Sequence, residues 1–273
     1  MSETRSLKGL YSGEQAVADL LVVGVIAVWW LTARAMPADV FPSVAKVGQA
    51  FLGLATTGEF WANAGTTALR IFGAVCIATF LGTLLGLLPR YIRWTGGIVD
   101  NILVPFFSSF PGIAWAILGT IWFGVTSQAV LFVQVLIILP FALVNVAEGA
   151  KAIGTEEVEM ARSFTRNRWT VFWRVELPLI SPFIIASVRI AYGVCWKISL
   201  IAELFGAQSG IGYLMQLSQD VGAVDRILAI CLWIVVFVMI GERLIIDRIA
   251  NFLDRAGGPP KRPARRLSFL SKG

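Results

Sequence analysis

A long stretch without any charged residue limits what this chain can fold into more than any other feature. Residues 101–147 contain no Asp, Glu, Lys or Arg. Such a stretch is hard to keep in water, and it is long enough for two bilayer crossings of about 20 residues each. Over the whole chain 57% of residues are hydrophobic and 15% are charged, where a soluble domain has about a quarter charged. The sequence therefore predicts an all-α integral membrane protein.

Six apolar segments are predicted to cross the membrane: 20–36, 67–88, 98–123, 129–147, 179–205 and 227–246. They form a single transmembrane domain, residues 20–249, between an N-terminal segment, 1–19, and a basic C-terminal tail, 250–273, which we expect to be disordered. The first span is short, and Ala33-Arg34-Ala35 resembles a signal-peptidase site. A signal peptide is therefore an alternative for this segment.

The basic residues predict the orientation of the spans. With the N-terminus inside, seventeen Lys and Arg residues fall in the segments on the cytoplasmic side, and only Arg34 and Lys46 fall in the outer loops. Inner loops of membrane proteins carry this excess, so both termini are predicted to be cytoplasmic. The net charge of +6 lies beside apolar spans and forms no aromatic-basic patch, so we expect no nucleic-acid partner.

The inner loop 148–178 is predicted to contain two short helices. Thr155 is a suitable N-cap for a helix over 156–164, whose Val158, Ala161 and Phe164 have helical spacing for an apolar contact. Asn167 can cap a second helix over 168–175, which Pro178 is expected to end. Two helices in so short a loop indicate a docking element for a partner.

This loop resembles the EAA loop of ABC importer permeases. Residues 159–165, EMARSFT, and 175–178, VELP, are similar to the motif E-A-A-x-x-L-G and the L-P that follows about a dozen residues later. The segments 100–124 and 201–214 resemble the nitrate/sulfonate/taurine permease family, and the resemblance covers roughly residues 66–249.

The resemblance implies a type-I-importer-like permease fold with six transmembrane helices and two short cytoplasmic coupling helices. It implies the permease subunit of an ATP-driven importer of the bacterial inner membrane, paired with a second copy of itself. Two cytoplasmic ATPase subunits, which hold ATP and Mg, and a periplasmic or lipid-anchored substrate-binding protein complete the system. The solute implied is a small anion such as a sulfonate, nitrate, bicarbonate or carboxylate. Within this chain we expect no cofactor, metal site or catalytic residue.

The residues that the resemblance assigns to the ATPase contact lie in the inner loop: Glu159, Ala161, Phe164, Thr165, Asn167, Leu177 and Pro178. Thr165 replaces the glycine of the motif, at a place where a helix end can turn left-handed. A β-branched residue is costly at positive φ, so we expect either a right-handed turn or local strain at Thr165.

Charges and breaks inside the spans suggest a translocation pathway, because an ionisable group there costs at least about 2.5–3.5 kcal/mol. The candidates are Pro111, Trp115, Arg189, Trp196, Lys197 and Glu203. Lys197 either faces the pathway or pairs with an acid such as Glu203 of a second copy, whereas Arg70 is expected to snorkel from the outer end of its span. The break Ser108-Ser109-Phe110-Pro111-Gly112 either lines the pathway or is a plain proline kink.

Other functions are less compatible with the sequence. A stand-alone secondary transporter or channel remains the alternative, although no paired inverted repeat is evident. The chain lacks the G-x-x-x-x-G-K-[S/T] phosphate loop, so it is not itself the ATPase. Without histidine or clustered acids in the spans, a membrane-embedded enzyme is disfavoured.

Overall fold

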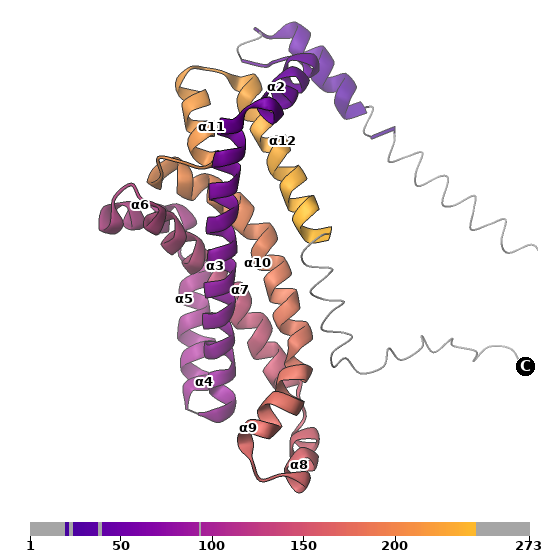
Figure 1. The fold of residues 1–273 in the computed structure, drawn as a ribbon, viewed down its shortest axis with the longest axis vertical. Coiled ribbons are helices and arrows are strands. Elements are labelled where there is room, and N and C mark those ends of the chain that lie inside the picture. The colour runs from indigo at the N-terminus through magenta and orange to yellow at the C-terminus, as the bar shows by residue number, and fades with distance from the viewer. Residues whose placement is uncertain (1–19, 22–23, 38–39, 93, 244–273) are drawn as a thin grey trace, which may run out of the picture.

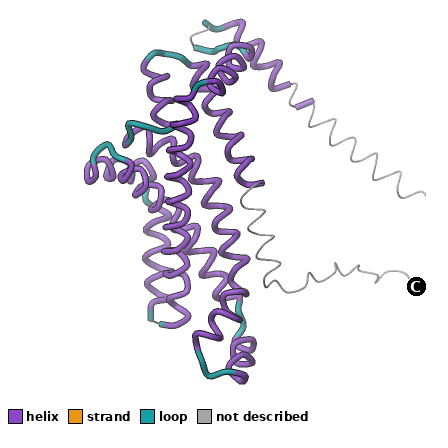
Figure 2. The backbone as a smooth tube through the Cα atoms, in the orientation of Figure 1, coloured by secondary structure: helices purple, strands orange, loops and turns teal. Residues whose placement is uncertain are grey.

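Long helices run side by side along the molecule, and short helices lie at its two ends (Figure 1). The computed structural model describes residues 20–21, 24–37, 40–92 and 94–243. The predicted N-terminal segment 1–19 and tail 250–273 lie outside this part. An apolar helix covers Gly24–Ala35, and nearly all of the described backbone is helical, joined by short loops (Figure 2).

The remaining helices follow in chain order. They are α2 (Val44–Thr56), α3 (Gly58–Tyr91), α4 (Thr95–Ile98), the π-helical segment η1 (Val99–Leu103), α5 (Val104–Ser109), α6 (Gly112–Phe123), α7 (Ser127–Ala152), α8 (Thr155–Phe164), α9 (Arg168–Val171), the π-helical segment η2 (Phe172–Glu176), α10 (Leu177–Gly206), α11 (Ile211–Asp220) and α12 (Val224–Gly241).

Four uninterrupted helices among the described residues are long and apolar enough to cross a membrane: 58–91, 127–152, 168–206 and 224–241. The bent pair 95–109 and 112–123 adds a fifth if it forms one span. These segments overlap five of the six predicted spans, and residues 244–246 at the end of the last one lie outside the described part. The predicted first span contains Gly24–Ala35, which is shorter than the others, and residues 22–23 within it are not described.

The predicted break in the third span is a sharp turn. The helices on its two sides, 95–109 and 112–123, meet at 83°. Phe110 and Pro111 both have extended backbone, and Pro111 is the N-cap of α6. A proline kink leaves a helix continuous, whereas here the helix stops and a new one starts, so the kink alternative is wrong. In Figure 1 α6 projects sideways from the long helices.

Both π-helical segments precede a proline. η1 ends two residues before Pro105, and η2 ends two residues before Pro178. A proline ring clashes with the carbonyl of the previous helical turn, and a locally widened turn relieves that clash. The backbone therefore continues as helix from Arg168 to Gly206. The prediction that Pro178 ends a separate second helix is wrong for this reason.

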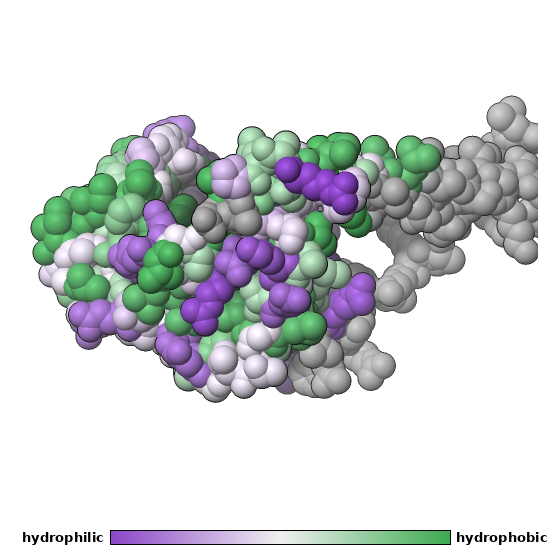
Figure 3. All heavy atoms as spheres, turned by 90° about the horizontal axis from the view of Figure 1, so that it is seen from above, coloured by the Kyte–Doolittle hydropathy of each residue, from purple (hydrophilic) through white to green (hydrophobic). Residues whose placement is uncertain are grey.

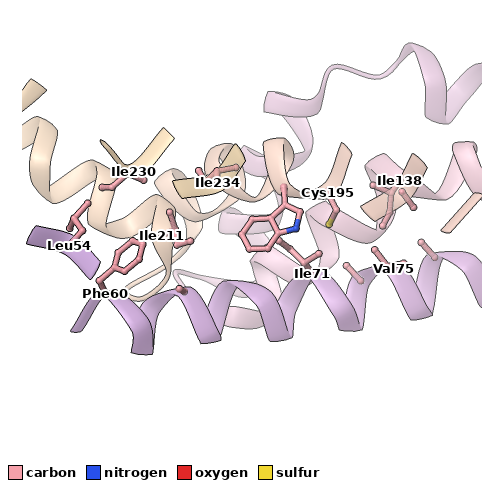
Figure 4. Close-up of a cluster of buried hydrophobic side chains, with 14 of the residues drawn as sticks. Leu54, Phe60, Ile71, Val75, Ile138, Cys195, Ile211, Ile230 and Ile234 are labelled. Atoms are coloured by element: carbon pink, nitrogen blue, oxygen red, sulfur yellow. The ribbon is translucent and has the colours of Figure 1, made fainter. Parts of the chain in front are cut away.

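The largest buried cluster joins six helices. Figure 4 shows its side chains pointing toward one another between the ribbons. They come from α2, α3, α7, α10, α11 and α12, and those labelled are Leu54, Phe60, Ile71, Val75, Ile138, Cys195, Ile211, Ile230 and Ile234. This core fixes α3, α7 and α10 as the centre of the fold, with α11 and α12 packed against one end.

The surface separates into an apolar flank and more polar ends. Large apolar side chains on the long helices are exposed, for example Leu69 at 75% and Phe80 at 69%, as expected for contact with lipid. Viewed onto the end formed by α2 and α11, hydrophilic and hydrophobic residues are interspersed, with a band of hydrophilic residues across the middle (Figure 3). The opposite end carries α8 and α9 (Figure 1).

Candidate coupling loop and translocation face

The first helix of the inner loop is fixed by its apolar side. α8 begins at Thr155 after Gly154, so the N-cap lies one residue before the predicted position. Glu156 and Glu157 occupy the first turn, where the helix dipole favours acids. On the side of the loop that faces the long helices, an apolar cluster joins α8 and α9 to α3, α7 and α10. Its buried members are Leu87, Val146, Ala150, Ile153, Val158, Val171 and Ile180.

The outer side of α8 presents Glu159 and Phe164 to the surroundings. Glu159 is exposed, and Phe164 is 85% exposed. The prediction that Phe164 shares the apolar contact of Val158 and Ala161 is wrong. Six residues turn a helix by about 600°, which places Phe164 about 120° away from Val158. Ala161 packs partly buried against the cluster, as expected.

The turn after α8 is extended and unstrained. Thr165 has φ −152° and ψ 134°, and no non-glycine residue of the described segments has positive φ. The prediction of a right-handed turn or strain at Thr165 is therefore wrong, because extended backbone suits a β-branched residue. Asn167 caps the next helix as predicted: its side chain accepts a 3.0 Å hydrogen bond from the Trp169 amide.

A polar clamp joins the loop to the end of α3. The Glu176 carboxylate, 4% exposed, accepts a hydrogen bond from the Tyr91 hydroxyl and lies 3.7 Å from Nε of Arg90. Arg90 also donates to the carbonyl of Ala150 at 2.9 Å. Leu177 follows directly, and it and Pro178 are half-buried in the first turn of α10.

The candidate pathway residues of the broken span differ in accessibility. Pro111 is exposed at the turn between α5 and α6. Trp115 is 6% exposed, and its ring lies 4.2 Å from that of Phe110, centroid to centroid. The structure thus places Trp115 in an aromatic cluster rather than on a free surface of the chain.

Two cations of α10 are exposed. Arg189 and Lys197 are both exposed, whereas Trp196 is 3% exposed and stacks on Phe237 at a centroid distance of 5.4 Å. Lys197 is therefore accessible on α10, whereas the adjacent indole of Trp196 is packed inside the chain.

Glu203 lies in a buried network instead of on this face. Its side chain is 0% exposed, and its oxygens accept hydrogen bonds from Thr67 Oγ1, Arg70 Nη1 and the Gly212 amide at 2.8–2.9 Å. A carboxylate enclosed in this way is not on a surface that Lys197 of a second copy could contact. Its bond to Gly212 also satisfies one free amide at the start of α11.

Arg70 is the partner that sequence reasoning missed. It is 7% exposed and donates to Glu203, to Ser127 Oγ at 2.8 Å, and to Ser209 at 2.7 Å and 2.9 Å. The prediction that Arg70 snorkels is wrong, because a paired and hydrogen-bonded guanidinium need not reach water. The available signal was the presence of opposite charges in two different apolar spans.

A glycine makes this network possible. Gly210 has φ +115°, and a Cβ at this position would overlap the Glu203 carboxyl group. Its amide donates to Asn63 Oδ1 at 2.6 Å. Both its backbone angle and the close approach of Glu203 exclude a larger residue.

Known proteins are similar to this chain in sequence. Residues 78–256, more than half of the chain, match the family described as the binding-protein-dependent transport system inner membrane component. The chain is 30% identical over 242 residues to SsuC of Escherichia coli, named as an aliphatic sulfonates transport permease protein, covering 86% of this chain and 88% of SsuC. It is 29% identical over 217 residues to TauC, the taurine transport system permease protein of Escherichia coli, covering 75% of this chain and 77% of TauC.

A solved structure has the same fold. A chain of the MetNI methionine ABC transporter, in its inward-facing conformations, matches with a TM-score of 0.57 and 21% identity, covering 71% of this chain and 93% of that one. The family predicted from the sequence is thus confirmed, and the alternative of a stand-alone transporter or channel is set aside. The protein is a multi-pass inner membrane transport subunit rather than an enzyme. It belongs to the ABC importer permeases that form the inner membrane component of binding-protein-dependent transport systems.

Proposed function

We propose that two copies of this chain form the pathway of an ATP-driven importer for a small anion of the sulfonate class. In this proposal two ATPase subunits, which carry ATP and Mg, bind at the cytoplasmic end, and an external substrate-binding protein delivers the solute. The names of SsuC and TauC, which refer to aliphatic sulfonates and taurine, support this solute class.

The observation that carries the proposal is the two-sided construction of α8. Val158 holds the helix against the bundle, while Glu159 and Phe164 project outward at the end of the molecule. An aromatic side chain that is 85% exposed on a fixed base has the features of an interface anchor. We infer that the ATPase receives this side of α8, with Asn167 holding the adjoining turn.

The loop is mechanically continuous with the proposed pathway. Residues 168–206 form 39 residues of helix, a length of about 58 Å. Glu176 clamps the inner part of this helix to Arg90 and Tyr91 of α3. A displacement of α8 by the ATPase would therefore move α3 and α10 as packed elements rather than bend a flexible linker.

The exposed Lys197 of α10 supports an anionic solute. Lys197 lies within the span and is exposed, and among the described residues no acid forms an ion pair with it. A charge within a membrane span carries a free-energy cost, so its presence there indicates a functional role. Lining the path between the two copies would supply one, because a sulfonate carries the opposite charge.

The coupling role is tested by ATPase association. We expect Phe164→Ala to weaken binding of the purified ATPase subunit by a factor of ten or more, since an interface anchor contributes roughly 2 kcal/mol. Trp94→Ala is the matched control, because Trp94 is 73% exposed but lies outside the loop. Undiminished association of the Phe164→Ala variant would contradict the proposed docking surface.

The pathway role is tested by uptake into vesicles containing the assembled transporter. Lys197→Met is expected to lower taurine or alkanesulfonate uptake several-fold while ATPase association stays unchanged, because the anion loses its counter-charge. Ile201→Met, on an exposed residue of the same helix, controls for the change in shape. If Lys197→Met leaves uptake rate and affinity unaltered, Lys197 does not serve the pathway.

A further inference from the structure

A cavity of about 320 Å³ opens between the end of α3 and the inner loop. Its apolar wall contains Leu84 and Leu88 of α3 and Phe172 of η2. Its polar rim contains Arg162 of α8 and Arg168 of α9. The volume is in the range of sites that hold small organic groups.

The two rim arginines are not neutralised by the protein. Among the described residues neither Arg162 nor Arg168 forms an ion pair, and both are exposed. Glu176, the acid at the cavity, is already held by Arg90 and Tyr91. The rim therefore offers two cationic groups for a ligand that brings its own negative charge.

The apolar wall ends where the membrane surface is expected. α3 is apolar through Leu88, and Pro89, Arg90 and Tyr91 follow. Trp169, which also lines the cavity, is 71% exposed. Exposed tryptophans and arginines beside an apolar helix end are typical of the level of lipid headgroups. This reasoning rests on the cytoplasmic location of the loop in the proposed function.

We propose that this cavity binds an anionic phospholipid of the inner leaflet. The phosphate of the headgroup would contact Arg162 and Arg168, and an acyl chain would lie along Leu84 and Leu88. Basic pockets beside transmembrane helices on the cytoplasmic side bind such headgroups. A soluble anion alone would leave the apolar wall exposed to water, which favours a lipid as the occupant.

The bound lipid would connect two parts of the coupling apparatus. Its headgroup contacts belong to α8 and α9, whereas its acyl contacts belong to α3. Occupancy would stabilise the loop against the span, so that the anionic lipid content of the membrane adjusts how firmly α8 is held.

The test uses the purified full-length chain in detergent without the ATPase, so that its outcome is independent of coupling. Dioleoyl-phosphatidylglycerol is expected to raise the thermal midpoint more than dioleoyl-phosphatidylcholine does. In native mass spectrometry, Arg162→Gln/Arg168→Gln should bind phosphatidylglycerol at least about tenfold more weakly, because two charge-assisted contacts are lost. Arg166→Gln/Arg174→Gln is the matched control, since it removes equal charge from the same loop but outside the cavity.

A second variant tests the apolar wall with both arginines kept. Leu88→Trp should fill the cavity and reduce phosphatidylglycerol binding, while glycerol phosphate without acyl chains should produce no thermal shift. Equal losses in the two double variants, equal responses to the two lipids, or a full response to glycerol phosphate would each overturn the lipid site. A further result would also overturn it: the chain binds no phosphatidylglycerol, and the Arg162→Gln/Arg168→Gln variant fails to bind the ATPase. The cavity would then be a contact site for the partner subunit.

Discussion

At the scale of single residues, the Arg70–Glu203 pair explains how two charges can lie inside an apolar bundle. Their 2.8 Å contact is buried at both ends, and each group has further hydrogen-bond partners. The pair joins α3 to α10 and, through Ser127 and Gly212, reaches α7 and α11. Removing one partner would leave an uncompensated charge, whereas removing both would not.

We therefore expect strong coupling between the two residues in a double-mutant cycle. Glu203→Gln and Arg70→Gln should each reduce the stability of the purified protein by about 3–5 kcal/mol, because each leaves a buried group without its counterpart. The double variant should lose clearly less than the sum of the two. Thermal midpoints followed by size-exclusion chromatography measure all four proteins.

Glu59→Gln supplies the control for this cycle, since Glu59 is an exposed acid at the same end of α3. It should leave the midpoint nearly unchanged. Additive losses in the Arg70 and Glu203 variants would show that the two side chains do not stabilise each other in the membrane protein.

Sequence reasoning at this scale identified charged positions better than their partners. Lys197 and Arg189 are exposed on α10, but Arg70 and Glu203 are 133 residues apart in the chain. Hydropathy assigns each residue a cost and contains no information on which spans are neighbours. Asn167, in contrast, was predicted correctly because its cap depends only on the next two residues.

At the scale of helices, α3 packs closely on α7 through two glycines. Gly82 and Gly86, four residues apart, are a small-xxx-small pair that allows close helix packing. A Cβ on Gly82 would lie 2.5 Å from Cβ of Ala142 and 2.8 Å from the Leu143 nitrogen. Backbone atoms cannot move aside as a flexible side chain can, so both glycines set the distance between the helices.

Gly82→Ala is accordingly expected to destabilise the protein by about 1–3 kcal/mol through overpacking. Gly65→Ala in the same helix is the control, because a Cβ there meets nothing within 4 Å. That control should be neutral or stabilise by up to about 1 kcal/mol through better helix propensity. Thermal unfolding distinguishes them, and equal midpoints of the two variants would contradict the close contact.

The bounds of two helices were predicted to within a few residues from their apolar runs, whereas the start of α3 was not. The predicted span 129–147 lies inside α7, and 179–205 lies inside α10. α3 starts at Gly58, well before the predicted residue 67. Its first turns contain polar residues, which lower the mean hydropathy and so conceal the start of the helix. The break at Ser108–Gly112 was predicted from composition, but its 83° angle depends on tertiary packing.

At the scale of the whole molecule, the proposals share one requirement: the end that carries α8 must be cytoplasmic. α11, which the loop 207–210 precedes, lies toward the opposite end (Figure 1). The excess of Lys and Arg near α8 predicts this orientation. The ATPase contact and the proposed inner-leaflet lipid site both depend on it, whereas the Arg70–Glu203 network does not.

Cysteine labelling in intact cells measures the orientation directly. In a background with the three native cysteines replaced by alanine, Ser163→Cys reports on α8 and Gln208→Cys on the opposite end; both positions are exposed. A membrane-impermeant maleimide should label Gln208→Cys at once and Ser163→Cys only after the cells are permeabilised, because the charged reagent cannot cross the hydrocarbon core. The reverse pattern would place α8 outside, away from any ATP, and the coupling proposal would have to be abandoned.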